Sequence, residues 1–150
     1  MTKRQRVLAV HGYALQIGLN NKVMLGQQAL DMCEEVWRMQ DEYDTIVLLG
    51  GWDTAEVGPS PTIAEAMRTW LLNKEPALEK KIFLPLESGQ RSTMPPRDTA
   101  EECMLLSKLF ENNFFPRTSA DVDAIAIGGI GGWTFRVWRI YHYLEAPMRN

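Results

Sequence analysis

Short apolar runs alternate along the chain with longer segments in which apolar residues recur at helical spacing. The runs at 6–11, 45–49, 81–84 and 122–127 are rich in Val, Ile and Leu. Such runs are typical of buried strands in a parallel sheet. We therefore predict four strands, each followed by a helix.

The four predicted helices are recognised by apolar residues three and four positions apart. We place the start of the second at Ser60 and Pro61, because Ser caps helices and Pro suits the first helical position. The last helix is predicted to follow a cluster of glycines directly. The stripes are Leu25, Ala29, Met32, Cys33, Val36 and Trp37; Ile63, Ala66, Met67, Trp70 and Leu71; Cys103, Leu106 and Phe110; and Phe135, Trp138, Tyr141 and Leu144.

The alternation predicts the α/β class, as a doubly wound three-layer α/β/α sandwich with a mostly parallel sheet. The length of 150 residues suits one domain spanning 1–150. In this architecture ligands bind outside the carboxyl ends of the strands. We therefore look for functional residues in the segments that directly follow the carboxyl ends of the four strands, which we call the strand exits.

The composition of the chain argues against several classes of binding partner. The net charge of −3 argues against nucleic acid as a partner, since that needs a basic face. The apolar run from Val7 to Val10 is too short for a signal peptide or a membrane span. Cys33 and Cys103 lie in helical stripes and are predicted to be buried, reduced thiols. We expect a cytoplasmic protein with no membrane partner and no metal, because no Cys/His cluster has zinc spacing.

Glycines mark the predicted strand exits. They occur as His11-Gly12, Gly50-Gly51-Trp52-Asp53, Glu87-Ser88-Gly89 and the cluster Gly128 to Gly132. Glycine lets backbone N–H groups approach a ligand, and a following helix N-terminus favours an anion. The alternative is that these glycines only end strands and turn the chain.

Other polar residues near the exits have two interpretations each. Asp98 to Glu101 forms either a capping box or a pair of ligand contacts through Thr99 and Glu101. Glu65 is either a surface carboxylate in a helix's first turn or a site residue. Arg136, one turn into the last helix, is either a surface residue or a contact to phosphate or carboxylate, and Trp133 either stacks on a ring or packs in the core. His11 is the one histidine at a strand exit and a candidate for acid–base chemistry.

The order of these motifs resembles the YdcF/SanA/ElyC-like family. The matching segments are Gly50-Gly51, Glu65-Ala66-Met67, Glu87-Ser88, Asp98 to Glu101, and Gly132 to Arg136. The resemblance implies a Rossmann-like fold with a ligand cleft at the carboxyl edge of the strands, and one member is described as binding S-adenosylmethionine. It carries over Gly50, Gly51, Glu65, Thr99, Glu101 and Arg136 as candidates. The chain departs from the family at Glu102 and Trp133, where Asn and His are common.

These observations together predict a protein that binds a small nucleotide-like or S-adenosylmethionine-like ligand, with a transferase as one activity of such a site. The alternatives are a metal-assisted hydrolase resembling phosphatases and a non-catalytic interaction protein. Candidate catalytic residues are Glu65, Glu101 and His11, and the last helix is a candidate homodimer interface. The candidate ligand-binding residues are Gly12, Gly50, Gly51, Trp52, Asp53, Glu65, Ser88, Thr99, Glu101, Gly128, Gly129, Gly131, Gly132, Trp133 and Arg136.

Overall fold

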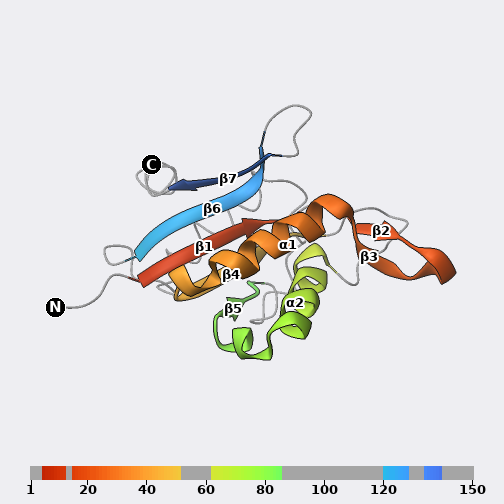
Figure 1. Cartoon of the computed structure of the whole chain (residues 1–150), viewed down its shortest axis with the longest axis horizontal. Coiled ribbons are helices and arrows are strands. Elements are labelled where there is room, and N and C mark those ends of the chain that lie inside the picture. The colour runs from red at the N-terminus through yellow and green to blue at the C-terminus, as the bar shows by residue number, and fades with distance from the viewer. Residues whose placement is uncertain (1–4, 13–14, 52–61, 86–119, 129–133, 140–150) are drawn as a thin grey trace.

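The computed structural model describes residues 5–12, 15–51, 62–85, 120–128 and 134–139 (Figure 1). Two helices and seven strands lie in these ranges, together with short 3₁₀ turns. The helices are α1 (Gln27–Met39) and α2 (Ile63–Lys74). The strands are β1 (Gln5–His11), β2 (Leu15–Ile17), β3 (Val23–Leu25), β4 (Thr45–Leu49), β5 (Ile82–Phe83), β6 (Ala120–Gly128) and β7 (Thr134–Arg139).

The main sheet has the strand order β5-β4-β1-β6-β7. Strand β1 pairs in parallel with β4 and β6, and β4 pairs in parallel with β5. At the centre, Val10 lies opposite Leu48 on one side and Ile125 on the other. The four predicted strands are confirmed, one with the same bounds and three with shifts of one or two residues at their ends, and they form a mostly parallel, Rossmann-like α/β sheet.

Helices α1 and α2 cover one face of this sheet and touch each other (Figure 1). Alternate residues of β1, β4 and β6 face them, so strand and helix side chains form one core. Cys33 of α1 is 1% exposed, which confirms the predicted buried thiol; Cys103 lies outside the described residues. The core includes Leu8, Val10, Ile46, Leu48 and Ile125 from the sheet and Ala29, Met32, Val36, Met67 and Leu71 from the helices.

The opposite face of the sheet is buried as well. Val7, Ala9, Val47, Leu49 and Ala124 alternate with the residues that face α1 and α2, and none is more than 1% exposed. A strand buried on both faces explains why these runs are continuously apolar instead of alternating. The helix predicted from Asp98 onward, which would supply a layer of its own, lies outside the described residues.

The predicted last helix is wrong for the segment 134–139, which forms strand β7. This strand runs antiparallel to β6, with Gly128 opposite Thr134 and Ala126 opposite Arg136. Phe135 and Trp138 are three positions apart, a spacing that fits a helix, but aromatic and β-branched residues also favour an edge strand. Tyr141 and Leu144 lie outside the described residues. The glycine cluster therefore connects two antiparallel strands and does not lead into a helix.

The start of each described helix also differs from the prediction. Leu25 belongs to β3, and α1 begins at Gln27 after a β2–β3 hairpin that the helical stripe did not reveal. The N-cap of α2 is Thr62, not Ser60. Thr62 takes the role because its hydroxyl and the carboxylate of Glu65 complete a capping box.

Candidate functional site

The carboxyl ends of β1, β4 and β6 lie along one edge of the sheet, as parallel strands require. Gly12, just after β1, donates its N–H to the carbonyl of Leu49 at a distance of 2.7 Å. The chain passes from β1 to β4 and β5 on one side and reaches β6 on the other side of β1. The space between the ends of β1 and β6 is therefore the topological switch point, where open α/β sheets bind their ligands.

The N-terminus of α2 also reaches this edge, but its backbone donors are used within the protein. The N–H groups of Ile63 and Ala64 bond to the carbonyls of Gly51 (2.9 Å) and Gly50 (3.3 Å). The N–H of Glu65 bonds to the Thr62 hydroxyl at 3.2 Å, and that of Ala66 to the Thr62 carbonyl at 3.1 Å. The first turn of α2 thus has its donors satisfied without a ligand.

Gly12 and Gly50 make this close approach of α2 possible. A Cβ at Gly12 would lie 2.5 Å from Cγ2 of Ile63 and 2.8 Å from the Leu49 carbonyl oxygen. A Cβ at Gly50 would lie 2.8 Å from Cβ of Ile63. All three distances are below van der Waals contact, so packing alone requires glycine at these two positions.

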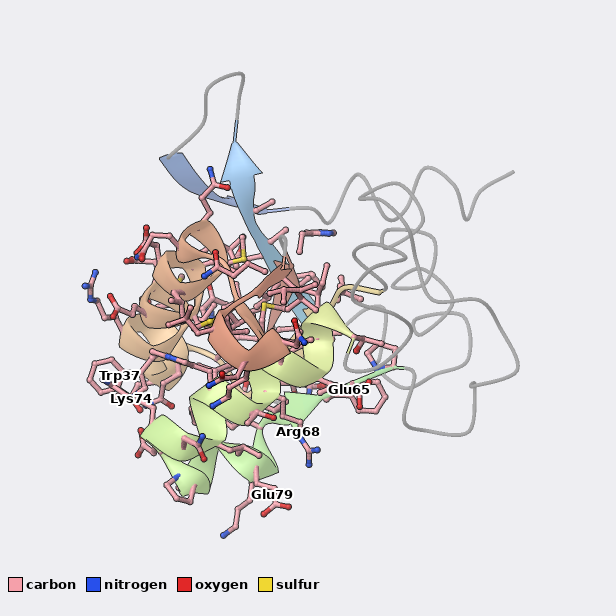
Figure 2. All side chains as sticks on the ribbon, turned by 90° about the vertical axis from the view of Figure 1, so that its right-hand side faces the viewer. Trp37, Glu65, Arg68, Lys74 and Glu79 are labelled. Carbon is pink, nitrogen blue, oxygen red and sulfur yellow. The ribbon has the colours of Figure 1, made fainter. Side chains whose placement is uncertain are left out.

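Glu65 is held by the capping box that starts α2. Its Oε1 accepts the N–H of Thr62 at 3.1 Å, and the side chain lies on the flank of the helix near Arg68 (Figure 2). Of the two interpretations of Glu65, the structure therefore gives it a definite local role at the helix start. The capping box predicted at Asp98 to Glu101 lies outside the described residues.

The N-terminus of α1 differs from that of α2. Its N-cap is Gly26, so no side chain caps it, and its first turn holds no acidic residue. Helix α1 follows β1 in the chain through the β2–β3 hairpin and packs against β6. Helix α1 is therefore connected to one strand of the switch point, β1, and in contact with the other, β6.

His11 ends β1 at this same edge and is 5% exposed. By strand alternation it lies on the face shared with Val7 and Ala9, away from α1 and α2. Gly128 ends β6, and Arg136 is placed by its pairing with Ala126. The candidates outside the described residues are Trp52, Asp53, Ser88, Thr99, Glu101, Gly129, Gly131, Gly132 and Trp133.

A polar cluster that the sequence pattern did not reveal lies away from this edge, and two of its three residues, Tyr43 and Asp123, are buried. Asp123 of β6 accepts the Tyr43 hydroxyl at 2.8 Å and faces the Arg6 guanidinium at 3.6 Å. Arg6 also stacks over the Tyr43 ring, 5.0 Å from its centroid. Burial, and next the hydrogen bond to Asp123, raise the pKa of Tyr43 well above its ordinary value. The only sequence signal was an aspartate within the apolar run 122–127.

Another departure from the predicted packing is Trp37, assigned to the core stripe of α1. It is 37% exposed, and Lys74 of α2 holds its ammonium 5.1 Å from the Trp37 ring centroid and 5.6 Å from that of Trp70. Figure 2 shows Trp37 and Lys74 next to each other on the surface. This pair joins the two helices by a cation–π contact.

The described part of the chain gathers no group of three or more His, Cys, Asp or Glu side chains that could hold a metal ion. Nor is any of its helices both long enough and apolar enough to span a membrane. The strand order and the carboxyl edge of the sheet define a Rossmann-like α/β protein with a switch point between β1 and β6. Comparison with family models, curated proteins and solved structures gives no match.

Proposed function

We propose that this protein binds a small, anionic, nucleotide-like ligand at the switch point between β1 and β6. The observation that carries the proposal is the strand order, because β1 and β6 are neighbours whose connections leave in opposite directions. In open α/β sheets such a switch point is where ligands bind, beyond the carboxyl ends of the two strands. His11, Gly12 and Gly128 border it from the described strands.

The contrast between the two helix starts supports a position for the anionic group. The first turn of α2 has its donors bonded to Thr62, Gly50 and Gly51, whereas α1 begins at Gly26 without a side-chain cap. The first turn of α1 contains no acidic residue; the nearby carboxylate of Asp31 accepts the side-chain N–H of Gln27 at 2.9 Å. A helix N-terminus with no acid in its first turn favours a phosphate or carboxylate. We therefore place the ligand's anionic group near α1.

The nature of the ligand rests on the resemblance to the YdcF-like family. That resemblance favours S-adenosylmethionine or another adenosine-containing ligand, and hence a transferase as the activity to test first. Arg136 remains a candidate contact, now from β7 and not from a helix. Buried, reduced Cys33 is compatible with the reducing cytoplasm that we propose as the protein's location.

The first test is a ligand panel followed by thermal shift and calorimetry. The panel holds S-adenosylmethionine, S-adenosylhomocysteine, ATP, AMP, adenosine and inorganic phosphate. We expect at least one adenosine-containing anion to raise Tm and to bind with measurable heat. The proposal is contradicted if no compound of the panel raises Tm or binds with measurable heat.

Two substitutions at Gly26 test the position of the anion. Its φ of −69° and ψ of 165° suit any residue, and both Gly26→Asp and Gly26→Asn supply a side-chain cap. Only Asp adds a negative charge, so we expect it to weaken the ligand found above by about tenfold or more relative to Asn. Equal affinities in the two variants would show that the anion does not lie at α1.

One observation favours a second candidate, the non-catalytic interaction protein. Ile63 and Met67 fill the part of the edge above β1 and β4, so close to the backbone that a Cβ at Gly12 has no room. If side chains also fill the carboxyl edge between β1 and β6, no small molecule can bind there. The ligand panel decides between the two. For the hydrolase alternative the described residues offer less, since the Glu65 carboxylate is bound at the helix start.

A further inference from the structure

Strands β1 and β6 are apolar on both faces where they pair, so burial alone does not fix how the two strands are aligned. The residues from Val7 to Val10 are all 0% exposed, and every residue of the run 122–127 except Asp123 is Val, Ala or Ile. In most sheets a shift by one residue exchanges a buried apolar face for a polar one, and this fixes the register. Between β1 and β6 such a shift exchanges one apolar face for another, so the register depends on the polar residue.

Asp123 occupies a position in β6 that is polar in an otherwise apolar environment. It lies opposite Leu8 of β1 and is 7% exposed. Its Oδ2 accepts the hydroxyl of Tyr43 at 2.8 Å and lies 3.6 Å from Nη2 of Arg6. A buried carboxylate and a buried hydroxyl are costly unless they are paired, so this position differs in energy from its neighbours along the strand.

Every shift of β6 along β1 breaks this pairing. A shift by one residue turns Asp123 to the opposite face of the sheet, away from Tyr43. A shift by two residues toward the carboxyl edge places Asp123 opposite Val10, which is completely buried in the core. A shift by two residues the other way places Ile125 opposite Leu8, so that the buried Tyr43 hydroxyl loses its acceptor.

We propose that the polar cluster of Arg6, Tyr43 and Asp123 is a register lock, in which the hydrogen bond between Asp123 and Tyr43 selects the alignment of β6 on β1. Buried polar groups can be retained for selecting one arrangement among several that pack equally well. A shift by two residues would move Gly128, at the end of β6, by about 6.6 Å relative to the end of β1. The cluster thereby sets the geometry of the carboxyl edge, and it does so whether or not a ligand binds there.

The lock is tested by NMR measurement of the strand pairing in the full chain. The wild type should give a single set of β6 signals, with interstrand NOEs that place Val10 beside Ile125. Asp123→Leu removes the acceptor, and a shift by two residues toward the carboxyl edge then brings Asp121 opposite Leu8, where Asp123 lies in the wild type. We therefore expect a second set of signals with NOEs in this shifted register, from about a tenth or more of the molecules.

Two further variants separate a choice of register from a plain loss of stability. Asp123→Asn keeps an oxygen that can accept the Tyr43 hydroxyl, so it should show the single wild-type register. Tyr43→Phe/Asp123→Leu removes both partners of the buried hydrogen bond and leaves neither unpaired, so it should fold and populate both registers. The pairing of Val10 with Leu48 on the other side of β1 should be unchanged in every variant.

The proposal is overturned if both apolar variants keep only the wild-type register, because apolar packing would then be enough to set it. It is overturned as well if Asp123→Asn shifts as Asp123→Leu does, since the hydrogen bond would then not select the register. Loss of the folded spectrum in both apolar variants would also overturn it. The cluster would in that case be needed for the fold itself and not for the choice of register.

Discussion

At the scale of single residues, two glycines have a steric role that their position in the sequence did not distinguish from ligand binding. Gly12 and Gly50 stand where ligand-binding residues are expected. The nearest atoms to a Cβ at these positions, however, belong to Ile63, Leu49, Met67 and Ala64. Glycines after a strand indicate that another group comes close to the backbone at that point. Only the structure shows whether the approaching group is a ligand or a helix.

The first prediction compares two glycines with equally short but different contacts. Gly12→Ala forces a Cβ against the Leu49 carbonyl and the Ile63 side chain, so we expect a loss of about 1–3 kcal/mol in the free energy of unfolding. In Gly18→Ala the nearest atom is the Met24 sulfur at 2.6 Å, which can rotate away. Its stability should stay within about 1 kcal/mol of the wild type in urea denaturation. Equal losses would refute the steric explanation.

At the scale of elements, the spacing of apolar residues predicted the structure correctly where it fits only a helix. It was misleading where the same spacing also fits a strand. The stripes of α1 and α2 predicted real helices, because their apolar residues meet the sheet at helical spacing. The segment 134–139 also spaces Phe135 and Trp138 three apart, but it is strand β7, and Leu25, which was assigned to the stripe of α1, belongs to β3 of the β2–β3 hairpin. Their pairing partners, β3 for β2 and β6 for β7, are set by the fold and not by the spacing.

The second prediction concerns the start of α2. Thr62→Ala removes the hydroxyl that accepts the Glu65 N–H, and should lower stability by about 1 kcal/mol. Glu65→Gln keeps an oxygen that can accept the Thr62 N–H, so it should cost less than Glu65→Ala. Thermal unfolding of the three variants checks this order. If Gln and Ala cost the same, the side-chain half of the capping box contributes nothing.

At the scale of the whole molecule, buried titratable groups link stability to pH. Burial raises the pKa of the Cys33 thiol from its ordinary value of 9.0 to about 12. The pKa of Tyr43, ordinarily 10.0, is raised by burial and by its bond to Asp123. Both groups stay protonated in the folded chain at a pH where the unfolded chain loses their protons.

The third prediction is therefore a loss of stability in alkali. A raised folded pKa means that the contribution is complete below the unfolded pKa and falls as the pH rises above it. For Cys33 we expect a loss of about 1 kcal/mol between about pH 9 and about pH 10. Urea denaturation over this range should show a shallower pH slope in Cys33→Ala, and Tyr43→Phe should reduce the slope at higher pH. An unchanged slope in both variants would contradict the assignment.

The sequence by itself determined the class of fold, the positions of the four parallel strands and the presence of two of the helices. It could do so because continuous Val, Ile and Leu runs and helical stripes are local consequences of burial. The tertiary structure alone decided the strand order, the hairpin after β1, the strand at 134–139 and the switch point between β1 and β6. The strand order and the switch point depend on which distant segments pair, as Val10 does with Leu48 and with Ile125. The hairpin and the strand at 134–139 depend on the nearby pairs Leu15 with Leu25 and Gly128 with Thr134, which the spacing of apolar residues does not distinguish from helical packing.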